Sequence, residues 1–443
     1  LGIVLGLLAA ALATKAPDCG GILTPSGLSY REYGRTGRAP RGRDAKGFTH
    51  QAPLTQPNQI DSVKVADLSL SLLPDAGLRL SIDADLGVVT APSTSKVVRL
   101  SILADLQVER NPEGNLELTT SACKPTMEEM QSTEEVERST PRAGSGSCRA
   151  AVPPCAPAPP LPVPQVCVEV SRLLVLPNQQ LASLSAQLPV TPSCQVQYVP
   201  LAAPVISEQG VTVSLQTTFL VAGVALPLPA SPTPFTMPEA ASASAAHLTL
   251  ALSTHFYTSF FFALDTVGAF NMTLAVSARS EAGADQLIGS VFQEDQPVVL
   301  RVAFRSSPWV VLEEGRALLK LFLAAHVGVG SPELQSVLSV NVDMTAGLLL
   351  SVADVRMMVS AAAIEDMELS LAASDVGPVP AALLEELLVP ALRDGVLAQM
   401  NEVLSEGIYL PHASNFVYTD ANVIIHKDYV LIPCNLKLQP RTG

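Results

Sequence analysis

The chain has 443 residues, which is long enough for two large domains, and 48 % of them are hydrophobic, which is ample for their cores. Only 15 % are charged, against about a quarter in ordinary globular domains, so the cores are expected to be mainly aliphatic. The net charge is −14, of which residues 1–149 contribute −1 and residues 150–443 contribute −13. This acidic balance argues against nucleic acid and anionic membranes as electrostatic partners.

The first thirteen residues are all Leu, Ala, Gly, Ile or Val. Ala11-Leu12-Ala13 fits a signal-peptidase site, so residues 1–13 are predicted to be part of a signal peptide and the protein to be secreted and extracellular. No other apolar run reaches the roughly 18 residues of a spanning helix, so no integral membrane segment is expected. The sequon Asn271-Met272-Thr273 agrees with secretion and predicts a glycan on Asn271.

The segments that follow the signal peptide have no clear periodicity. Residues 17–30 are predicted to be irregular. Residues 31–47 place six Arg and Lys residues among glycines, a composition compatible with an RNA-binding or anion-binding arm. The same composition is more typical of a disordered insertion, and we expect disorder near 31–58.

From Ile60 onward, apolar and polar residues alternate, which predicts a meander of antiparallel strands with one solvated face. The alternation slips at Ala66-Asp67 and is most regular over 98–108. The predicted strands are 63–72, 78–82, 98–108 and 116–118. Residues 124–165 are rich in Glu, Ser, Gly and Pro and predict a disordered loop.

A helix-compatible apolar stretch returns at 166–188, interrupted by Pro177, and a strand is predicted at 211–221. The Pro-rich segment 226–240 is the predicted linker between an N-terminal domain, 14–225, and a C-terminal domain, 241–443. In the C-terminal domain the pattern predicts a short aromatic helix at 254–263. The strand-like runs after it are 270–277, 297–304, 309–312, 317–326, 338–343, 347–359, 363–371 and 422–431.

The longest predicted helix covers 380–406, where apolar residues recur at spacings of three and four. Pro380 suits its first turn, Gly407 suits a left-handed cap, and Pro390 and Gly395 predict a kink. So apolar a helix must lie along an equally apolar surface, and the strands upstream are the obvious partner.

Seven cysteines are an odd number, so at least one thiol stays free or pairs between chains in an oxidising compartment. Their scatter is not a zinc pattern, and Cys148 and Cys155 are better explained as loop cysteines than as ligands of a two-ligand metal site. The pairing of the other five stays open at this point: Cys19, Cys123, Cys167, Cys194 and Cys434.

No catalytic motif is present in the chain. It contains no Gly-x-Ser-x-Gly, no His-Glu-x-x-His and no phosphate-binding glycine loop, so we predict no catalytic residues, no metal, no cofactor and no enzyme activity. His255 beside Phe256 and Tyr257 could act as a base. A lone His at a helix start without a partner motif is more often structural.

Several stretches together resemble one known family. The segment from Val376 to Glu386 and its continuation from Val403 to Pro411 are similar to the last long helix, exit turn and closing strands of the BPI/LBP/PLUNC family, the lipid-binding proteins of the TULIP fold. Residues 165–170 resemble the family's N-domain helix. The Pro-rich linker and the aromatic segment at 254–263 fall where the family has them, and residues 16–30 are most similar to its avian egg-white ovoglobulin (TENP-like) branch.

The resemblance implies an α+β protein with two elongated antiparallel barrels, each wrapped around a long helix and joined by a central sheet into a boomerang. It implies the shared family disulfide between Cys123 and Cys167. It also implies a secreted protein that holds phospholipid or another acyl-chain lipid, including bacterial envelope lipid, with an innate-defence role. Candidate lipid-contacting residues are Phe256, Tyr257, Phe260, Phe261, Leu383, Leu387, Leu388 and Leu392, although ordinary core has the same composition.

The chain departs from the family where the tracts 31–58 and 124–165 replace expected helices. Either the first barrel is incomplete or these tracts come from a misassigned exon, which we favour because they match no surrounding pattern. No cationic cluster stands in the N-terminal half outside the first tract, which argues against charge-based endotoxin binding. The alternative function is a structural or interaction protein of extracellular fluid whose barrels are filled with side chains.

Overall fold

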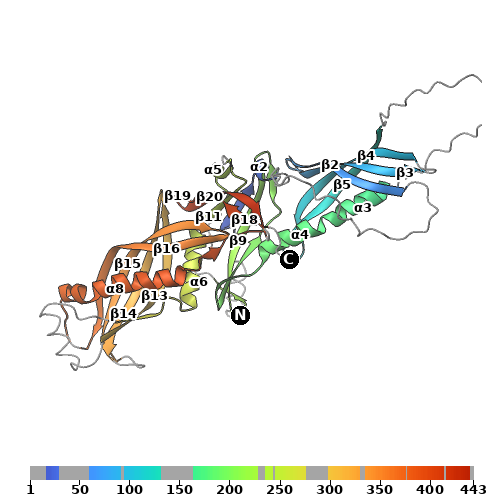
Figure 1. Ribbon diagram of the computed structural model, residues 1–443. Helices are drawn as coiled ribbons and strands as arrows, with labels where there is room; N and C mark the ends of the chain where they lie inside the picture. The colour runs from blue at the N-terminus through green and yellow to red at the C-terminus, as the bar shows by residue number, and fades with distance from the viewer. Residues whose placement is uncertain are drawn as a thin grey trace, which may run out of the picture. The chain divides into compact units, whose positions relative to one another are not determined.

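The computed structural model describes ten stretches of the chain: 16–28, 59–90, 94–130, 163–227, 235–242, 245–275, 298–329, 335–375, 377–413 and 416–439. The predicted signal peptide and the tract 31–58 lie outside them. The fold is mixed α+β and dominated by antiparallel sheets, as predicted (Figure 1). It divides into a larger unit of residues 1–30, 109–117 and 178–443 and a smaller unit of residues 31–108 and 118–177. The predicted boundary at 226–240 stays a prediction.

The smaller unit is built on a four-stranded sheet in the order β2-β3-β4-β5. Its strands are β2 (Gln59–Leu73), β3 (Gly77–Thr90), β4 (Thr94–Arg110) and β5 (Leu116–Met130). Apolar residues of β3 and β4 face each other across the ladder, as with Ile82 and Ile102, so the alternation that predicted the strands also defines the buried face. The predicted slip is confirmed, because the β2–β3 register shifts between Val65 and Asp67.

Two helices follow this sheet in the chain, α3 (Val163–Leu173) and α4 (Val175–Ala182). The predicted interruption by Pro177 is confirmed: α3 ends at Leu173 and α4 begins at Val175, because a proline at 177 cannot donate to the carbonyl of Leu173 and its ring clashes with it. The predicted loop 124–165 is wrong at both ends, since 124–130 extend β5 and 163–165 begin α3. Cys123, Pro125 and Met127 are half-buried, and the residues between them are exposed. The acidic residues that follow made this alternation hard to recognise in the sequence. Residues 131–162 lie outside the described residues.

Cys123 of β5 and Cys167 of α3 form a disulfide, which confirms the predicted pairing. Their Cα atoms lie 5.9 Å apart. The bond joins the helix to the last strand of the sheet and closes a loop of sequence separation 44. It therefore restricts the unfolded chain around the segment 131–162.

The larger unit contains a ten-stranded sheet with the path β18-β20-β11-β1-β9-β7-β6. Strands β8 and β10 pair with β9, and β19 pairs with β20. It joins segments from both halves of the sequence, as a central sheet was expected to do. The strands are β1 (Cys19–Leu23), β6 (Leu188–Thr191), β7 (Cys194–Pro200), β8 (Val205–Ser207), β9 (Gly210–Val221), β10 (Val224–Ala225), β11 (Leu248–Ser253), β18 (Phe416–Thr419), β19 (Ile424–His426) and β20 (Tyr429–Leu438).

Strand β1 corrects the prediction that residues 17–30 are irregular. It is a central strand, hydrogen-bonded to β9 on one side and β11 on the other. Its glycines permit close packing, since a Cβ at Gly20 would lie 2.6 Å from the carbonyl oxygen of Val213. A one-turn helix, α2 (Pro25–Leu28), follows it.

The second sheet of the larger unit has six strands in the order β12-β13-β14-β15-β16-β17. They are β12 (Met272–Ala275), β13 (Val298–Glu313), β14 (Arg316–Val329), β15 (Gln335–Ala353), β16 (Arg356–Ser374) and β17 (Ile408–Tyr409). The predicted strand 347–359 is wrong, because β15 turns into β16 at Asp354, which has φ 52°. The predicted runs 297–304 and 309–312 are one strand with register shifts between Phe304 and Trp309. The run 422–431 is a hairpin that turns at Asp428.

Three helices complete the larger unit: α5 (Glu239–Ser242), α6 (Thr254–Thr266) and α8 (Ala381–Leu404). Helix α8 continues through Pro390 as a single helix, and Gly407 beyond it has φ 63°, as predicted for a left-handed cap. Helix α6 packs between β13 and strands β9 and β11, and α8 packs on β16 and β12 (Figure 1). One apolar core unites both helices, the inner face of the six-stranded sheet and one face of the ten-stranded sheet.

Candidate functional site

The aromatic residues predicted to contact lipid lie on α6. The hydroxyl of Ser253 caps this helix by accepting a hydrogen bond from the Phe256 amide at 3.4 Å. Phe256, Tyr257, Phe260 and Phe261 are all completely or almost completely buried. Two of them contact aromatic rings of neighbouring strands: Phe256 stacks with Tyr198 of β7, and Phe260 lies tilted against Phe219 of β9. The helix thus anchors the ten-stranded sheet to β13.

One hydroxyl in this aromatic cluster is buried without a partner. The Tyr257 oxygen makes no hydrogen bond to any residue that the structure describes, and the side chain is fully buried. Burial also raises the pKa of the Tyr257 phenol, so this group stays a neutral donor. An orphaned donor in an apolar interior costs about 1–3 kcal/mol. The Tyr257 hydroxyl is therefore a buried donor that no described residue uses.

The predicted leucines lie on α8, where burial repeats at every fourth residue. The buried stripe consists of Leu384, Leu388, Leu392, Val396, Met400 and Leu404. Leu383 and Leu387 sit beside the stripe and are half-buried. The α6 aromatics and Leu388 and Leu392 belong to one core cluster, against which Leu387 packs. Packing is the role that the structure gives these residues, and contact with a ligand stays a prediction.

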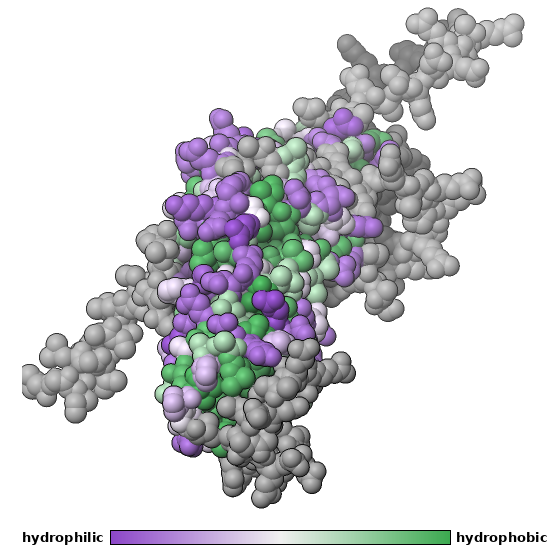
Figure 2. Space-filling view, turned by 90° about the vertical axis from the view of Figure 1, so that its left-hand side faces the viewer, coloured by the Kyte–Doolittle hydropathy of each residue, from purple (hydrophilic) through white to green (hydrophobic). Residues whose placement is uncertain are grey.

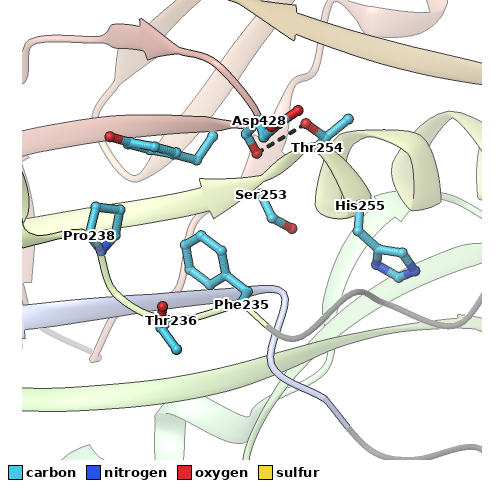
Figure 3. A pocket seen from close by; sticks show the side chains of 8 residues that line it. Phe235, Thr236, Pro238, Ser253, Thr254, His255 and Asp428 are labelled. Atoms are coloured by element: carbon cyan, nitrogen blue, oxygen red, sulfur yellow. Dashed lines mark hydrogen bonds between the residues drawn. The ribbon is translucent and has the colours of Figure 1, made fainter.

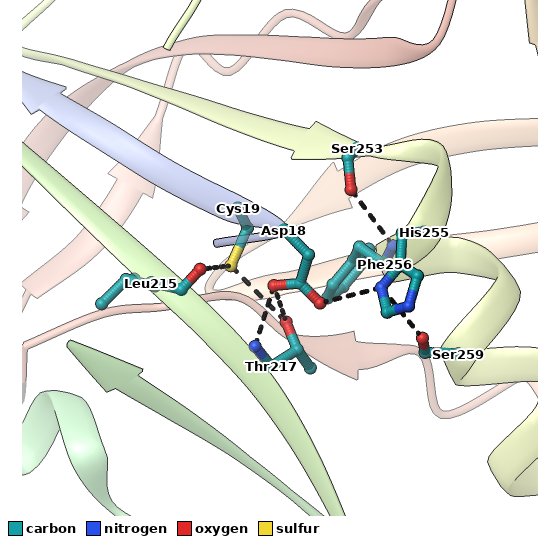
Figure 4. A network of polar contacts seen from close by, with 8 residues as sticks. All are labelled: Asp18, Cys19, Leu215, Thr217, Ser253, His255, Phe256 and Ser259. Carbon is teal, nitrogen blue, oxygen red and sulfur yellow. Dashed lines mark hydrogen bonds and ion pairs between the residues drawn. The ribbon is translucent and has the colours of Figure 1, made fainter. Parts of the chain in front are cut away.

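A polar network lies beside α6, between the ten-stranded sheet and the start of the helix (Figure 4). Asp18, just before β1, is 1 % exposed. Its Oδ1 accepts hydrogen bonds from the backbone N–H of Thr217 at 2.8 Å and from the Thr217 hydroxyl at 3.0 Å. Its Oδ2 lies 3.4 Å from Nδ1 of His255 and makes no hydrogen bond within the described part of the chain.

His255 also contacts Ser259, whose hydroxyl lies 3.3 Å from the same Nδ1 atom. A Ser-His-Asp relay needs the serine and the carboxylate on opposite ring nitrogens, because one receives the proton while the other orients the ring. Here both groups meet Nδ1. The geometry therefore matches the structural interpretation of His255 better than the interpretation as a base.

A cavity of about 530 Å³ opens next to this network (Figure 3). It lies where the segment 235–238, the start of α6 and the turn between β19 and β20 come together. Its wall carries hydroxyls, an imidazole and a carboxylate as well as rings. The lining residues are Phe235, Thr236, Pro238, Ser253, Thr254, His255, Asp428 and Tyr429. None of them belongs to the predicted lipid-contacting set.

Three cysteines of the ten-stranded sheet are free and buried: Cys19 in β1, Cys194 in β7 and Cys434 in β20. Burial raises the pKa of Cys194 to about 11 and that of Cys434 to about 12. The pKa of Cys19 is also raised, first by burial and then by the nearby charge of Asp18. Among the described residues, no group of three or more His, Cys, Asp and Glu is placed to hold a metal. Cys148 and Cys155 lie outside the described residues.

The sequon lies at the start of β12. Asn271 ends a turn, its N–H donating to the Gly268 carbonyl at 3.1 Å. Asn271 and Thr273 are exposed, and Met272 between them is buried. Alternation along the strand therefore places the sequon's two polar side chains on its solvent side. Glycosylation of Asn271 stays a prediction.

Two features of this region were not predicted from the sequence. Asp18 and Thr217 come from segments almost 200 residues apart and carry no motif, so only the pairing of β1 with β9 brings them together. Leu369 and Leu371 of β16 lie on the inner face of the six-stranded sheet, opposite the buried Val342 and Val340. They were not among the predicted lipid-contacting residues. Their alternation with Glu368 and Ser370 was a usable signal.

Known proteins resemble this chain in sequence and in fold. Residues 190–438 match the family model for the C-terminal domain of the LBP/BPI/CETP family. The chain is 51 % identical to Protein TENP of Gallus gallus over 99 % of both chains, and 26 % identical to human BPI fold-containing family B member 2 over 62 % of each. The crystal structure of lipopolysaccharide binding protein superposes with a TM-score of 0.52 at 15 % identity. The match covers 96 % of this chain and 100 % of that one, and shows a shared fold.

Proposed function

Because this chain belongs to the LBP/BPI/CETP family, we propose that it binds lipid, with acyl chains lying against the apolar interior between α8 and the six-stranded sheet. Each CH₂ group moved from water into such surroundings gains about 0.8 kcal/mol. The proposed ligand is a phospholipid or another lipid with acyl chains. No reactive group is needed for this function.

The buried, unpartnered hydroxyl of Tyr257 is the observation that carries the proposal. The surrounding cluster consists of apolar side chains, and Asp18 is the one carboxylate buried among the described residues, already engaged by Thr217 and His255. An ester or phosphate oxygen of a lipid would give the Tyr257 hydroxyl the acceptor it lacks. Apolar walls with few polar groups are typical of ligand sites for such molecules.

The proposed setting is extracellular. The signal-peptide pattern of residues 1–13 and the disulfide between Cys123 and Cys167 support it, because disulfides persist in oxidising compartments. Among the described residues, no helix is long and apolar enough to cross a membrane. An innate-defence role through bacterial envelope lipid is the narrower proposal. With −13 on residues 150–443, it would depend on acyl chains rather than on attraction to anionic head groups.

Native mass spectrometry of the secreted protein, followed by lipid extraction, tests the proposal. One or two phospholipids per chain are expected, and protein stripped of lipid should bind phosphatidylcholine again from vesicles. Tyr257→Phe is the matched variant: it removes one oxygen atom and should weaken binding by roughly two- to tenfold, the worth of one neutral hydrogen bond. Without lipid it should leave stability unchanged or slightly raised.

Competition between phosphatidylcholine and bacterial lipid A tests the narrower proposal, which requires lipid A to displace bound phosphatidylcholine. A second candidate function is a structural protein without ligand, favoured by the complete burial of Leu388, Leu392 and the α6 aromatics by protein atoms. Protein that is secreted free of lipid and refuses added phosphatidylcholine would establish that candidate instead.

A further inference from the structure

The inner face of β16 becomes steadily more exposed toward the end of the strand. Met357, Val359 and Ala361 are buried, Met367 and Leu369 are half-buried, and Leu371 is 39 % exposed. Leu371 pairs directly with Val340 of β15, which is 1 % exposed, so both side chains are on the same face of the sheet. The inner-face side chains of β16 therefore become exposed on the side away from β15, where α8 runs.

Helix α8 is fastened to β16 at the opposite end. The side chain of Asn401 makes two hydrogen bonds with the backbone of Ala361, and Arg356 donates to the carbonyl of Glu406 at 2.7 Å and to its carboxylate at 3.0 Å. Since the chain passes from Ser374 into α8 within seven residues, the helix begins beside the exposed end of β16 and runs back along it. Its first turns present Leu383 and Leu387, both half-buried.

We call the apolar side chains at this end of the two packed elements the distal seam: Met367, Leu369 and Leu371 of β16 with Leu383 and Leu387 of α8. The space-filling view from the side of the larger unit shows apolar residues at the surface among hydrophilic ones (Figure 2). One exposed acidic residue, Glu386 of α8, lies three positions from Leu383 and therefore borders the seam on the helix surface. Its negative charge disfavours anionic head groups and tolerates neutral or zwitterionic ones.

We propose that the distal seam is where the acyl chain of a neutral or zwitterionic lipid passes between α8 and β16 into the apolar interior, an inference that rests on the proposed function. Met367, Leu369 and Leu387 of the seam pack against the core cluster that contains the buried stripe of α8. An acyl chain in the seam covers apolar surface that is otherwise left to water. The fastened end of α8 stays closed while lipid enters and leaves at the other end.

Uptake kinetics of a phosphatidylcholine with a fluorescent acyl chain, transferred from vesicles to lipid-stripped protein, test this route. Leu371→Glu places a charge in the seam and should slow uptake roughly tenfold, equal to about 1.4 kcal/mol on the barrier. Leu349→Glu is the matched control, since Leu349 is 62 % exposed and points to the outer face of β15 in the same sheet. It should leave the rate unchanged. Thermal melting confirms that both variants fold.

Each outcome separates this inference from the function on which it rests. A wild-type protein that takes up no lipid overturns the proposed function. Normal uptake by Leu371→Glu and by a second seam variant, Leu383→Glu, overturns the seam while lipid binding stands. Equal slowing by Leu349→Glu overturns it as well, because a general effect of added negative charge then explains the rate.

Discussion

The buried carboxylate of Asp18 and the half-buried imidazole of His255 form a pair, with 3.4 Å between Oδ2 and Nδ1. Asp18 immediately precedes β1, and His255 lies in the first turn of α6, so the pair joins two parts of the chain that are more than 200 residues apart. The other carboxylate oxygen holds Thr217 of β9 through two hydrogen bonds. One side chain thus connects β1, β9 and α6.

Asp18→Asn tests this connection. An amide can still accept from Thr217 through its oxygen, but then its NH₂ group faces His255 and the charge is gone. We expect the free energy of unfolding to fall by about 2 kcal/mol, the usual cost of breaking a buried hydrogen-bonded charge. Urea denaturation measures the loss. Asp366→Asn, an exposed change on β16, is the control, and equal midpoints for the two variants would refute the connecting role.

Asn401 of α8 completes the free edge of β16. Its Oδ1 accepts from the Ala361 N–H at 2.8 Å, and its Nδ2 donates to the Ala361 carbonyl at 3.1 Å, as a neighbouring strand would do. Strand β17 covers this edge only at Arg356 and Met357. An unpaired strand edge is otherwise open to association with other chains.

Asn401→Leu removes both hydrogen bonds and keeps the size of the side chain. The free energy of unfolding should fall by about 1–2 kcal/mol because two backbone groups lose their partner. Glu402→Ala, the next residue and exposed, is the control for a change on the same helix. Thermal melting compares the two. A loss no larger than that of the control would show that water satisfies Ala361 equally well.

Helices and strands were predicted from the spacing of apolar residues wherever that spacing continued along the whole element. Strand β4 alternates over its length, and α8 carries apolar residues at spacings of three and four, so both were predicted close to their observed bounds. Strand β1 was missed because it is only five residues long and is buried along its length, so no alternation exists to detect. The β15–β16 turn was missed because Asp354 interrupts an apolar run without Gly or Pro.

The site was predicted less completely than the fold, for a physical reason. The run of aromatic residues on α6 identified the elements that meet in the interior. Core and ligand pocket share one composition, so the sequence could not separate Phe260 as packing from Phe260 as a ligand contact. The Asp18–His255 pair depends on strand pairing between distant segments. The exposure gradient along β16 depends on where α8 lies. Neither the pair nor the gradient can be predicted from the residues of one local segment.

The three buried thiols should not react with alkylating reagents in the folded protein. With a pKa of about 11 for Cys194, only about one molecule in a thousand carries a thiolate at pH 8, and the thiolate is the reactive form. Iodoacetamide labelling at pH 8, followed by peptide mass spectrometry, should leave Cys19, Cys194 and Cys434 unmodified. In guanidinium chloride all three should react. Rapid labelling of Cys434 in the native protein would contradict the burial of the ten-stranded sheet.

Asp265 should make stability depend on pH. Desolvation at the end of α6 raises its pKa, so the folded state holds this proton more tightly than the unfolded chain does. The contribution of Asp265 to folding stability is therefore most favourable at pH values below its unfolded-state pKa of about 4. It is lost as the pH rises through the folded-state pKa. Asp265→Asn should stabilise by about 0.5 kcal/mol at pH 7, helped by removing a negative charge from a helix C-terminus.

The gain from Asp265→Asn should vanish near pH 3, where the aspartate is protonated in both states. Urea midpoints of the wild type and the variant at the two pH values measure the difference. Asp394→Asn, an exposed change in the middle of α8, is the control for the loss of a surface carboxylate. A gain of equal size at both pH values would exclude titration of Asp265 as its cause.

Gly395 lets α8 approach β12 closely enough to close the space over the six-stranded sheet. A Cβ at this position would lie 2.6 Å from both methyl groups of Leu274. Gly395→Val should therefore force the Leu274 side chain or the helix to shift and lower the free energy of unfolding by about 1–2 kcal/mol, a cost typical of overpacking. Ala391→Val, one turn earlier and half-buried, controls for a β-branched residue in the helix.

The cause of that loss can be isolated with Leu274→Ala, which removes the methyl groups that the new side chain meets. If the clash with Leu274 is responsible, the double variant should lose at least about 1 kcal/mol less than the sum of the two single losses. Denaturant titration of the four proteins completes the cycle. Additive losses would mean that Gly395 acts through the helix backbone alone, and the close approach of α8 to β12 would then contribute nothing to stability.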